Sequence, residues 1–360
     1  MEVFGVELSQ LEGILAGVGP VDTVGASFAV LRVRGVDVDF SLPRRDVDTG
    51  AGHRGFLVHA DPRMTPAEAA RRRDFTINSI SMDPLTGEVV DPVGGRADLE
   101  AGLLRATDQV AFGEDPLRAL RAVQFAARFD LRWGPELPPL MAAQDLAELP
   151  SERLEQELRK LLLRGVRPSR GLALAQEAAL GDQLPALGGE LAPRGAALDR
   201  WVTTRPADSF AALAEGWTLL LDHVATAEQE ALLERVGPPA RLIRAVRTLR
   251  RAGLPAATRE ALRRAARELG GVGLSLASLL RVVEAEGHDV QEVRESAREL
   301  AVLEASPVDA VQGRHVLARG VAPGPAVGEI VRACRDLQDR EGIDHVDRLL
   351  DAVLASSGTT

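Results

Sequence analysis

The sequence predicts an α+β fold, in which a small mixed sheet with helices is followed by an all-α remainder. Alternating, strand-like patterns occur in the first part of the chain, whereas from about residue 109 the pattern is helical and rich in Ala, Leu, Arg and Glu. At 360 residues the chain is long enough for several domains with separate cores. We therefore expect the main boundary near residues 105–110.

A β-hairpin is predicted over residues 28–42. Residues 28–34 alternate in polarity, Gly35 turns the chain, and the apolar residues between 36 and 42 share one face. Asp37 and Asp39 fall on the opposite face, where two carboxylates can hold an oxygen-seeking Mg²⁺. The alternative is two polar residues on the wet side of a half-buried strand, and the residues alone favour that alternative.

Cap residues predict where two of the helices begin. Thr65-Pro66-Ala67-Glu68 is a capping box with proline at the first helical position, so a helix should run from there towards Arg73. Asp115-Pro116 repeats this arrangement and should open a second helix, with the apolar residues at 117, 120 and 127 facing inward.

The rest of the chain is predicted to be helical with one interruption. Ser151 should cap a helix that ends near Leu163. Residues 181–205 are rich in Gly and Pro and are predicted to form a loop, after which helices resume to about residue 304. A last unit should open at Pro307 and contain a helix over about 326–340.

The composition indicates where in the cell the protein is located and excludes some kinds of disulfide and metal site. No stretch approaches eighteen apolar residues, and no basic segment precedes an apolar run near Met1, so we expect a soluble, cytoplasmic protein without membrane partners. Cys334 is the only cysteine, which excludes an internal disulfide and a multi-cysteine zinc site. We expect it to be a buried apolar residue on a late helix.

The net charge of −10 argues superficially against nucleic acid, because RNA affinity depends largely on cationic contacts with phosphates. Basic residues nevertheless cluster at 71–73, 118–132 and 159–170, while acidic residues are spread widely. Each cluster taken alone is typical of a solvated helix face. A mildly acidic protein can still carry a basic track for RNA.

Two motifs carry the most information. Residues 72–78 read Arg-Arg-Asp-Phe-Thr-Ile-Asn, and residues 114–118 read Glu-Asp-Pro-Leu-Arg. With Gly-Glu-Val-Val-Asp-Pro at 87–92 and Gly-Arg-Ala-Asp-Leu at 95–99, they resemble the active-site and neck region of the class II tRNA nucleotidyltransferase/poly(A) polymerase family. The resemblance covers about 3–170 well and 306–342 weakly.

The resemblance implies four domains. These are a polymerase-beta-like, N-terminally incomplete nucleotidyltransferase head at 1–108, a nucleotide-selecting helical neck at 109–175, a helical body at 176–304 and a helical tail at 305–360.

Base selection can be assigned to the second motif. Adenine and cytosine present an amino donor beside a ring-nitrogen acceptor, whereas guanine and uracil present a carbonyl acceptor beside an N–H donor. A carboxylate and a guanidinium side by side would pair with A or C and clash with G or U. The resemblance assigns this role to Asp115 and Arg118, with Glu114 orienting Arg118. The alternative is a helix N-cap with an exposed ion pair, which does not exclude base reading.

The resemblance implies further contacts. Arg72, Arg73 and Asp74 would contact the sugar and phosphates of the incoming nucleotide, with Asn78 near the ribose. Asp39 would be the third catalytic carboxylate and a ligand of the cofactor Mg²⁺, on a strand that ends in Arg44. Arg121 is also expected to bind the nucleotide. The residues expected to contact RNA are Arg128, Arg159, Lys160 and Arg164.

The sequence departs from the family pattern in three places. The Gly-Gly-x-Val-Arg-Asp segment and the Asp-x-Asp pair that the family places before a strand like Glu2–Gly5 are not in the sequence, so we expect the chain as written to be severely impaired. Gln124 stands where the family commonly has arginine. His288-Asp289 is the only His-Asp dyad, and we expect no metal site within 206–304.

The leading hypothesis is a template-independent nucleotidyltransferase that adds C, A or both to the 3′ end of tRNA from CTP and ATP. Poly(A) polymerase activity is an alternative of the same class, because the Asp/Arg pair serves both bases. A non-catalytic RNA-binding remnant is an alternative of a different class, and a generic helical scaffold is the third. The oligomeric state is left open.

Overall fold

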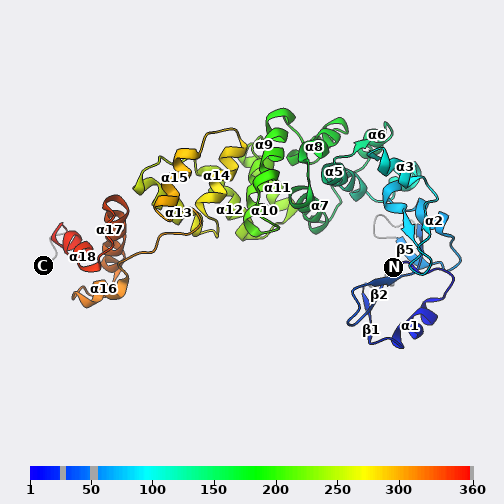
Figure 1. Ribbon diagram of the computed structural model, residues 1–360, viewed down its shortest axis with the longest axis horizontal. Coiled ribbons are helices and arrows are strands. Elements are labelled where there is room, and N and C mark those ends of the chain that lie inside the picture. The colour runs from blue at the N-terminus through cyan, green and yellow to red at the C-terminus, as the bar shows by residue number, and fades with distance from the viewer. Residues whose placement is uncertain (25–29, 49–55, 357–360) are drawn as a thin grey trace. The chain divides into compact units, whose positions relative to one another are not determined.

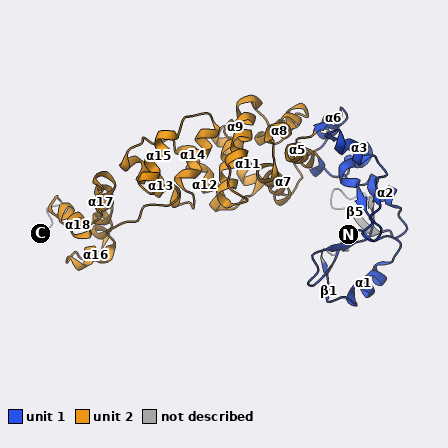
Figure 2. Cartoon of the chain, in the orientation of Figure 1, with its two compact units in different colours: residues 1–118, 132–144 blue, residues 119–131, 145–360 orange. Residues whose placement is uncertain are grey.

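The computed structural model describes residues 1–24, 30–48 and 56–356 (Figure 1). The chain divides into two compact units, one of residues 1–118 and 132–144 and the other of residues 119–131 and 145–360 (Figure 2). The division passes through one long helix, α5 (Leu117–Phe129), just after Arg118. The four predicted domain boundaries stay predictions.

The first unit is the α+β part that the sequence predicts. Its helices are α1 (Leu8–Ala16), α2 (Pro66–Arg71), η2 (Thr76–Ser79), α3 (Gly95–Glu100), α4 (Gln109–Phe112) and α6 (Leu137–Ala142). Its strands are β1 (Val21–Val24), β2 (Val30–Val33), β3 (Asp39–Ser41), β4 (Arg44–Asp48), β5 (Phe56–Ala60), β6 (Ser81–Met82), β7 (Val89–Val90), β8 (Leu103–Leu104) and β9 (Arg132–Trp133).

The described strands form four small sheets. β1, β2 and β3 make an antiparallel three-stranded sheet in that order, while β4 pairs with β5 and β6 with β7, both antiparallel. β8 and β9 pair in parallel. Helix α1 supplies Leu11 and Leu15 to a core shared with Leu31, Val33 and Leu42 of the three-stranded sheet and its edge.

The predicted hairpin is confirmed over its described part, since β2 and β3 pair antiparallel and Gly35 has a φ of 89° in the connection. Phe28 and Ala29 lie outside the described residues. One detail is wrong: the ladder stops at the Arg32–Asp39 pair, so residues 34–38 form the connection and Asp37 precedes the strand. Asp37 and Asp39 therefore do not share a strand face.

The capping predictions for α2 and α5 are confirmed. Thr65 accepts a hydrogen bond from the Glu68 backbone N–H, and the Glu68 carboxylate accepts one from the Thr65 N–H at 2.8 Å. Asp115 Oδ1 accepts from the Leu117 N–H at 3.1 Å. The apolar residues of α5 at 117, 120 and 127 are buried, as their spacing predicts.

The second unit is helical, apart from its irregular connections. After its part of α5 it contains α7 (Ser151–Arg164), α8 (Pro168–Glu177), η3 (Leu180–Asp182), η4 (Pro185–Leu187), α9 (Leu191–Thr204), α10 (Phe210–Leu220), α11 (Thr226–Val236), α12 (Ala240–Arg251), α13 (Arg259–Gly270), α14 (Leu276–Ala285), α15 (Gln291–Glu299), α16 (Gly313–Ala318), α17 (Pro325–Glu341) and α18 (Val346–Ser356). None of the described helices is long and apolar enough to cross a membrane.

Two predictions about this unit are wrong. The predicted loop at 181–205 contains α9, because Leu198 and Trp201 are fully buried there and their burial outweighs the Gly and Pro content of the segment. Ser151 is the first helical residue of α7 rather than its cap; the cap position is Pro150, and no side chain caps the helix. The predicted helix at about 326–340 is confirmed as α17.

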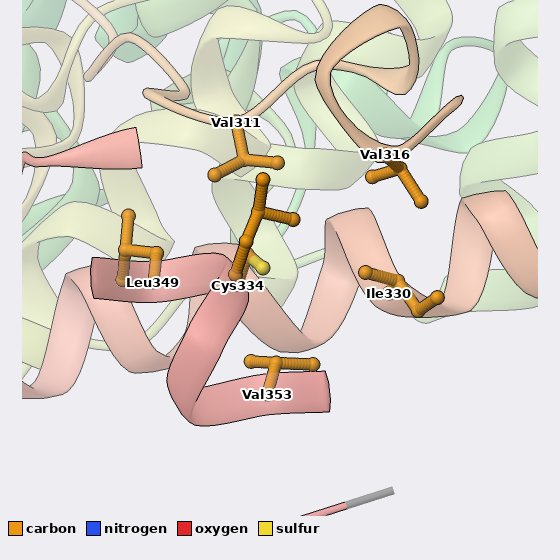
Figure 3. Close-up of a cluster of buried hydrophobic side chains, with 7 residues drawn as sticks. Val311, Val316, Ile330, Cys334, Leu349 and Val353 are labelled. Carbon is orange, nitrogen blue, oxygen red and sulfur yellow. The ribbon is translucent and has the colours of Figure 1, made fainter. Parts of the chain in front are cut away.

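Helices α16, α17 and α18 share a small apolar core. Val316, Ile330, Cys334, Leu349 and Val353 are among its buried members (Figure 3). Cys334 is fully buried, as the sequence predicts, and burial raises the pKa of its thiol.

A partly buried ion network joins this core to α13. Asp339 of α17 accepts hydrogen bonds from Arg263 Nε at 2.6 Å and from Arg267 at 2.9 and 3.1 Å. Arg267 also donates to Asp309, and Arg335 donates to the same carboxylate at 2.7 Å. Two carboxylates thus share three guanidinium groups between helices that are far apart in the sequence.

Candidate nucleotide-binding site

The segment that follows α2 is fixed by its own polar side chains. Asp74 is buried, and its Oδ1 accepts hydrogen bonds from the Phe75 N–H and from Asn78 Nδ2, both at 2.9 Å. The Asp74 carbonyl oxygen accepts from the Thr107 N–H at 3.1 Å. Asp74 and Asn78, both predicted to contact the nucleotide, therefore also shape the turn that follows Arg72 and Arg73.

Helix α3 packs directly against this segment. Asp91 caps α3 by accepting from the Gly95 N–H at 2.7 Å and the Arg96 N–H at 2.9 Å. Thr76 Oγ1 donates to Asp98 Oδ2 at 2.7 Å. A Cβ atom on Gly95 would lie 2.1 Å from the Thr76 carbonyl oxygen, so only glycine permits this approach.

We expect Gly95→Ala to lower the stability of the first unit by about 1–3 kcal/mol, because the opposing atoms are backbone. Gly13→Ala in α1 is the matched control, since nothing lies within 4 Å of its Cβ position and alanine favours a helix. Thermal unfolding of both variants checks the prediction. Wild-type stability of Gly95→Ala would contradict it.

Arg118 links three parts of the first unit. Its two terminal nitrogens donate to the carbonyl oxygens of Arg72, at 2.8 Å, and of Ala111. It therefore ties the first turn of α5 to the end of α2 and to α4. The Arg118 backbone N–H donates to the Asp115 carbonyl at 2.9 Å, which places the two side chains on one turn of the chain.

Glu114 contacts Arg72 rather than Arg118. The Arg72–Glu114 ion pair measures 3.6 Å, and among the residues that the structure describes Arg118 forms no ion pair with Glu114. Any orienting effect on Arg118 is therefore indirect, through Arg72, whose carbonyl Arg118 binds. Arg73 lies nearby in the chain, is 44% exposed at its side chain and pairs with Glu2 at 2.8 Å.

Asp39 lies at the start of β3, opposite Arg32 in the ladder. Its two carboxylate oxygens accept from Arg32 at 2.6 and 3.0 Å. The hydrogen bond from Arg32 lowers the pKa of Asp39, so the carboxylate is ionised at neutral pH. Arg44 opens β4, and its side chain lies outside the described part of the structure.

The residues predicted to meet RNA lie in the second unit, and most have acidic partners. Glu157 is buried on α7, lies 2.7 Å from Lys160 Nζ and lies 3.9 Å from Arg121. Arg159 and Arg164 both approach Asp208 at 3.4 Å. These two acids offset much of the predicted basic track. Glu157 could have been found from the sequence, because it falls within the leucine stripe of its helix.

Gln124 stands on α5 where the family pattern has arginine. It is buried, and its Oε1 has no hydrogen-bond partner among the described residues. The position points into the packed interior of the second unit in this chain. Arg128, by contrast, is exposed and lies over the Phe129 ring.

Comparison with known sequences finds relatives among tRNA-processing enzymes. A family model described as the poly A polymerase head domain matches residues 22–105. A multifunctional CCA protein of Stenotrophomonas maltophilia is 44% identical over 172 residues, which are 46% of this chain and 42% of that protein. A CCA-adding enzyme of Pseudomonas putida is 36% identical over 223 residues, 60% of this chain and 58% of that one. The chain spans about half the length of the curated relatives it matches.

Solved structures share the whole fold. The Bacillus stearothermophilus CCA-adding enzyme in complex with CTP matches with a TM-score of 0.70 and 24% identity over 96% of this chain and 87% of that chain. The Thermotoga maritima CCA-adding enzyme complexed with tRNA matches with a TM-score of 0.68 and 20% identity over 99% and 86%. At these identities the likeness establishes the fold.

Proposed function

Because this chain belongs to the class II tRNA nucleotidyltransferase/poly(A) polymerase family, we propose that it adds C, A or both to the 3′ end of tRNA without a template. The nucleotide donors would be CTP and ATP. Solved neighbours of the same fold were obtained with CTP, with ATP and with tRNA, which supports these partners.

The observation that carries the proposal is the Asp115/Arg118 pair at the first turn of α5. An ionised carboxylate has about four acceptor positions, and one of its oxygens takes the Leu117 N–H. A guanidinium has five N–H donors, of which the contacts to Arg72 and Ala111 need two. In the proposed complex the Asp115 carboxylate would supply the acceptor and the remaining Arg118 N–H groups the donor for a base.

The exocyclic amino group of cytosine or adenine would donate to Asp115, and the ring nitrogen would accept from Arg118. Guanine or uracil would set a carbonyl oxygen against the carboxylate, which repels it. Each bidentate pairing of this kind gives roughly 1–3 kcal/mol of discrimination. Arg72 and Arg73 precede the pair in the same unit and would supply positive charge for the triphosphate.

The family implies a divalent cation, and we propose Mg²⁺, with Asp39 as a ligand. Carboxylate oxygen suits this ion. The described residues, however, contain no group of three or more His, Cys, Asp or Glu that could hold a metal, and Arg32 takes both oxygens of Asp39. These residues do not form a cation site by themselves.

The test is incorporation of each labelled nucleotide, from CTP, ATP, GTP and UTP, into a tRNA that ends before its 3′ CCA. Because we expect this chain to be severely impaired, we expect CTP and ATP to bind and CMP, AMP or both to be incorporated only slowly in Mg²⁺. None should be incorporated in EDTA or into tRNA whose 3′ ribose has been oxidised with periodate. CTP or ATP binding that depends on Asp115 and Arg118, without incorporation, would identify a member of the family that lacks its metal site. Absence of both binding and incorporation would refute the proposal.

Poly(A) polymerase activity is the second candidate, favoured by the match of residues 22–105 to the poly A polymerase head domain. Product length separates the two. A CCA-adding enzyme stops after completing a short fixed end, whereas a poly(A) polymerase extends the same RNA with a long run of AMP.

A further inference from the structure

Phe129 is an aromatic side chain in an unusual position. The chain has nine Phe, three Trp and no Tyr, and of those whose side chains the structure describes only Phe129 is classed as exposed, at 47%. It is the last residue of α5. One exposed apolar residue is ordinary by itself, so its surroundings decide what it can do.

Those surroundings form a ladder of two rings and two guanidinium groups on one side of α5. The Phe125 and Phe129 ring centroids lie 5.6 Å apart with the planes tilted by 41°. The Arg128 guanidinium lies 5.0 Å from the centre of the Phe129 ring, and that of Arg121 lies 5.5 Å from the Phe125 ring. Both distances are within the range of cation–π attraction.

The outer end of the ladder is open and cationic. Phe125 is buried and Arg121 lies near Glu157, so the inner end is anchored in the packed unit. Arg128 is exposed, and no carboxylate pairs with it within the described part of the chain. An exposed ring beside an unneutralised guanidinium is therefore the surface that this ladder presents.

The backbone beyond the ring is fixed rather than frayed. Asp130 follows with a φ of 50°, a left-handed conformation, and accepts hydrogen bonds from Arg170 at 2.8 Å and Arg167 at 3.3 Å. Burial raises the pKa of Asp130, but the hydrogen bonds and charges of these two arginines together have the larger effect and hold the pKa below its usual value. The Asp130 carboxylate is therefore ionised at neutral pH and stays paired with both arginines. The Val166 N–H also donates to the Ala127 carbonyl at 3.0 Å.

We propose that Phe129 and Arg128 form a stacking platform for an unpaired base of the RNA substrate, an inference that rests on the proposed function. Proteins hold single-stranded RNA by stacking bases on aromatic rings while arginine contacts the neighbouring phosphate. Every base has a flat face, so such a platform tolerates any base. It would hold a 3′ end whose last nucleotide changes from one addition to the next.

The test compares two RNAs and three variants by fluorescence anisotropy. One RNA is an acceptor hairpin with unpaired nucleotides at its 3′ end, and the other is the same hairpin with a blunt end. Phe129→Leu keeps an apolar side chain and removes the ring, while Phe129→Trp keeps a ring. Leu254→Ala is the matched control, because Leu254 is 41% exposed in the same unit. Circular dichroism checks that each variant is folded.

We expect Phe129→Leu to weaken binding of the overhanging RNA by roughly 5- to 150-fold and to leave blunt binding unchanged. Phe129→Trp should restore the preference, and Leu254→Ala should not alter it. 2-Aminopurine placed in the overhang should lose fluorescence on binding to wild type and regain it with Phe129→Leu.

Three outcomes would overturn the inference. These are wild-type affinities for Phe129→Leu, equal loss for both RNAs, and a change in oligomeric state, which would identify the ring as a protein contact. If wild type incorporates nucleotides but Phe129→Leu binds the overhanging RNA in preference to the blunt RNA as strongly as wild type does, only the platform inference is refuted. If wild type binds neither RNA nor nucleotides, the proposed function fails with it.

Discussion

Replacing Asp115 with asparagine should reduce the preference of this protein for CTP over UTP by roughly 5- to 150-fold. A carboxylate only accepts hydrogen bonds, so it rejects the carbonyl edge of uracil, whereas an amide can also donate to that edge. The loss of about 1–3 kcal/mol of discrimination corresponds to this change in ratio. Isothermal titration with CTP and UTP gives the two affinities directly.

The substitution separates base reading from capping. Asparagine caps helices about as well as aspartate, so the Leu117 N–H should keep its acceptor and the fold should be retained. Asp108→Asn is the matched control, because Asp108 caps α4 in the same way, with Oδ1 accepting at 2.8 and 2.9 Å. Equal changes in the CTP/UTP ratio for the two variants would show that Asp115 only caps.

Replacing Asp339 with asparagine should destabilise the packing of α17 on α13 by about 3 kcal/mol. Asp339 and Arg263 are both less than a tenth exposed at their side chains, so the change leaves a buried guanidinium without its counter-charge. Protection of α17 backbone amides from hydrogen exchange should fall by roughly 100-fold at pH 6. Asp336→Asn, an exposed acid one turn earlier on α17, should change stability by less than about 0.5 kcal/mol.

The Asp339 effect should also depend on pH. Burial raises the pKa of Asp339, but hydrogen bonds from Arg267 and Arg263 outweigh it and lower the pKa below its usual value. A carboxylate with a lowered folded-state pKa stabilises the protein above its unfolded pKa of about 3.9, and that contribution is lost as pH falls through the folded value. The difference in free energy of unfolding between wild type and Asp339→Asn should therefore be largest at pH 6 and decrease below about pH 4. A gap that stays constant down to pH 3 would contradict this account.

Local signals in the sequence predicted local structure well. The Thr65 capping box and the Asp115 cap involve groups three residues apart or fewer, so sequence spacing alone determines whether they can meet. The loop predicted at 181–205 failed because Gly and Pro suggest a turn, whereas burial of Trp201 against other helices stabilises α9. Burial is a tertiary effect that spacing does not reveal.

In the candidate site, too, the sequence did not reveal contacts between residues that are far apart in the chain. Residues 72–78 and 114–118 were identified by their motifs, but the bond from Arg118 to the Arg72 carbonyl joins residues 46 apart and could not be deduced from either motif. The same applies to Asp208, which approaches both Arg159 and Arg164 from more than forty residues away. Charge clusters in a sequence therefore overestimate the free positive charge of the folded chain, because their partners come from elsewhere.

The most direct test of the central claim is the affinity of the unmodified protein for each of the four ribonucleoside triphosphates under one set of conditions. If Asp115 and Arg118 read the base, CTP and ATP will bind at least about 5-fold more tightly than UTP and GTP. Equal affinity for all four would mean that binding depends on the triphosphate alone, and would contradict the base-selecting role assigned to this pair.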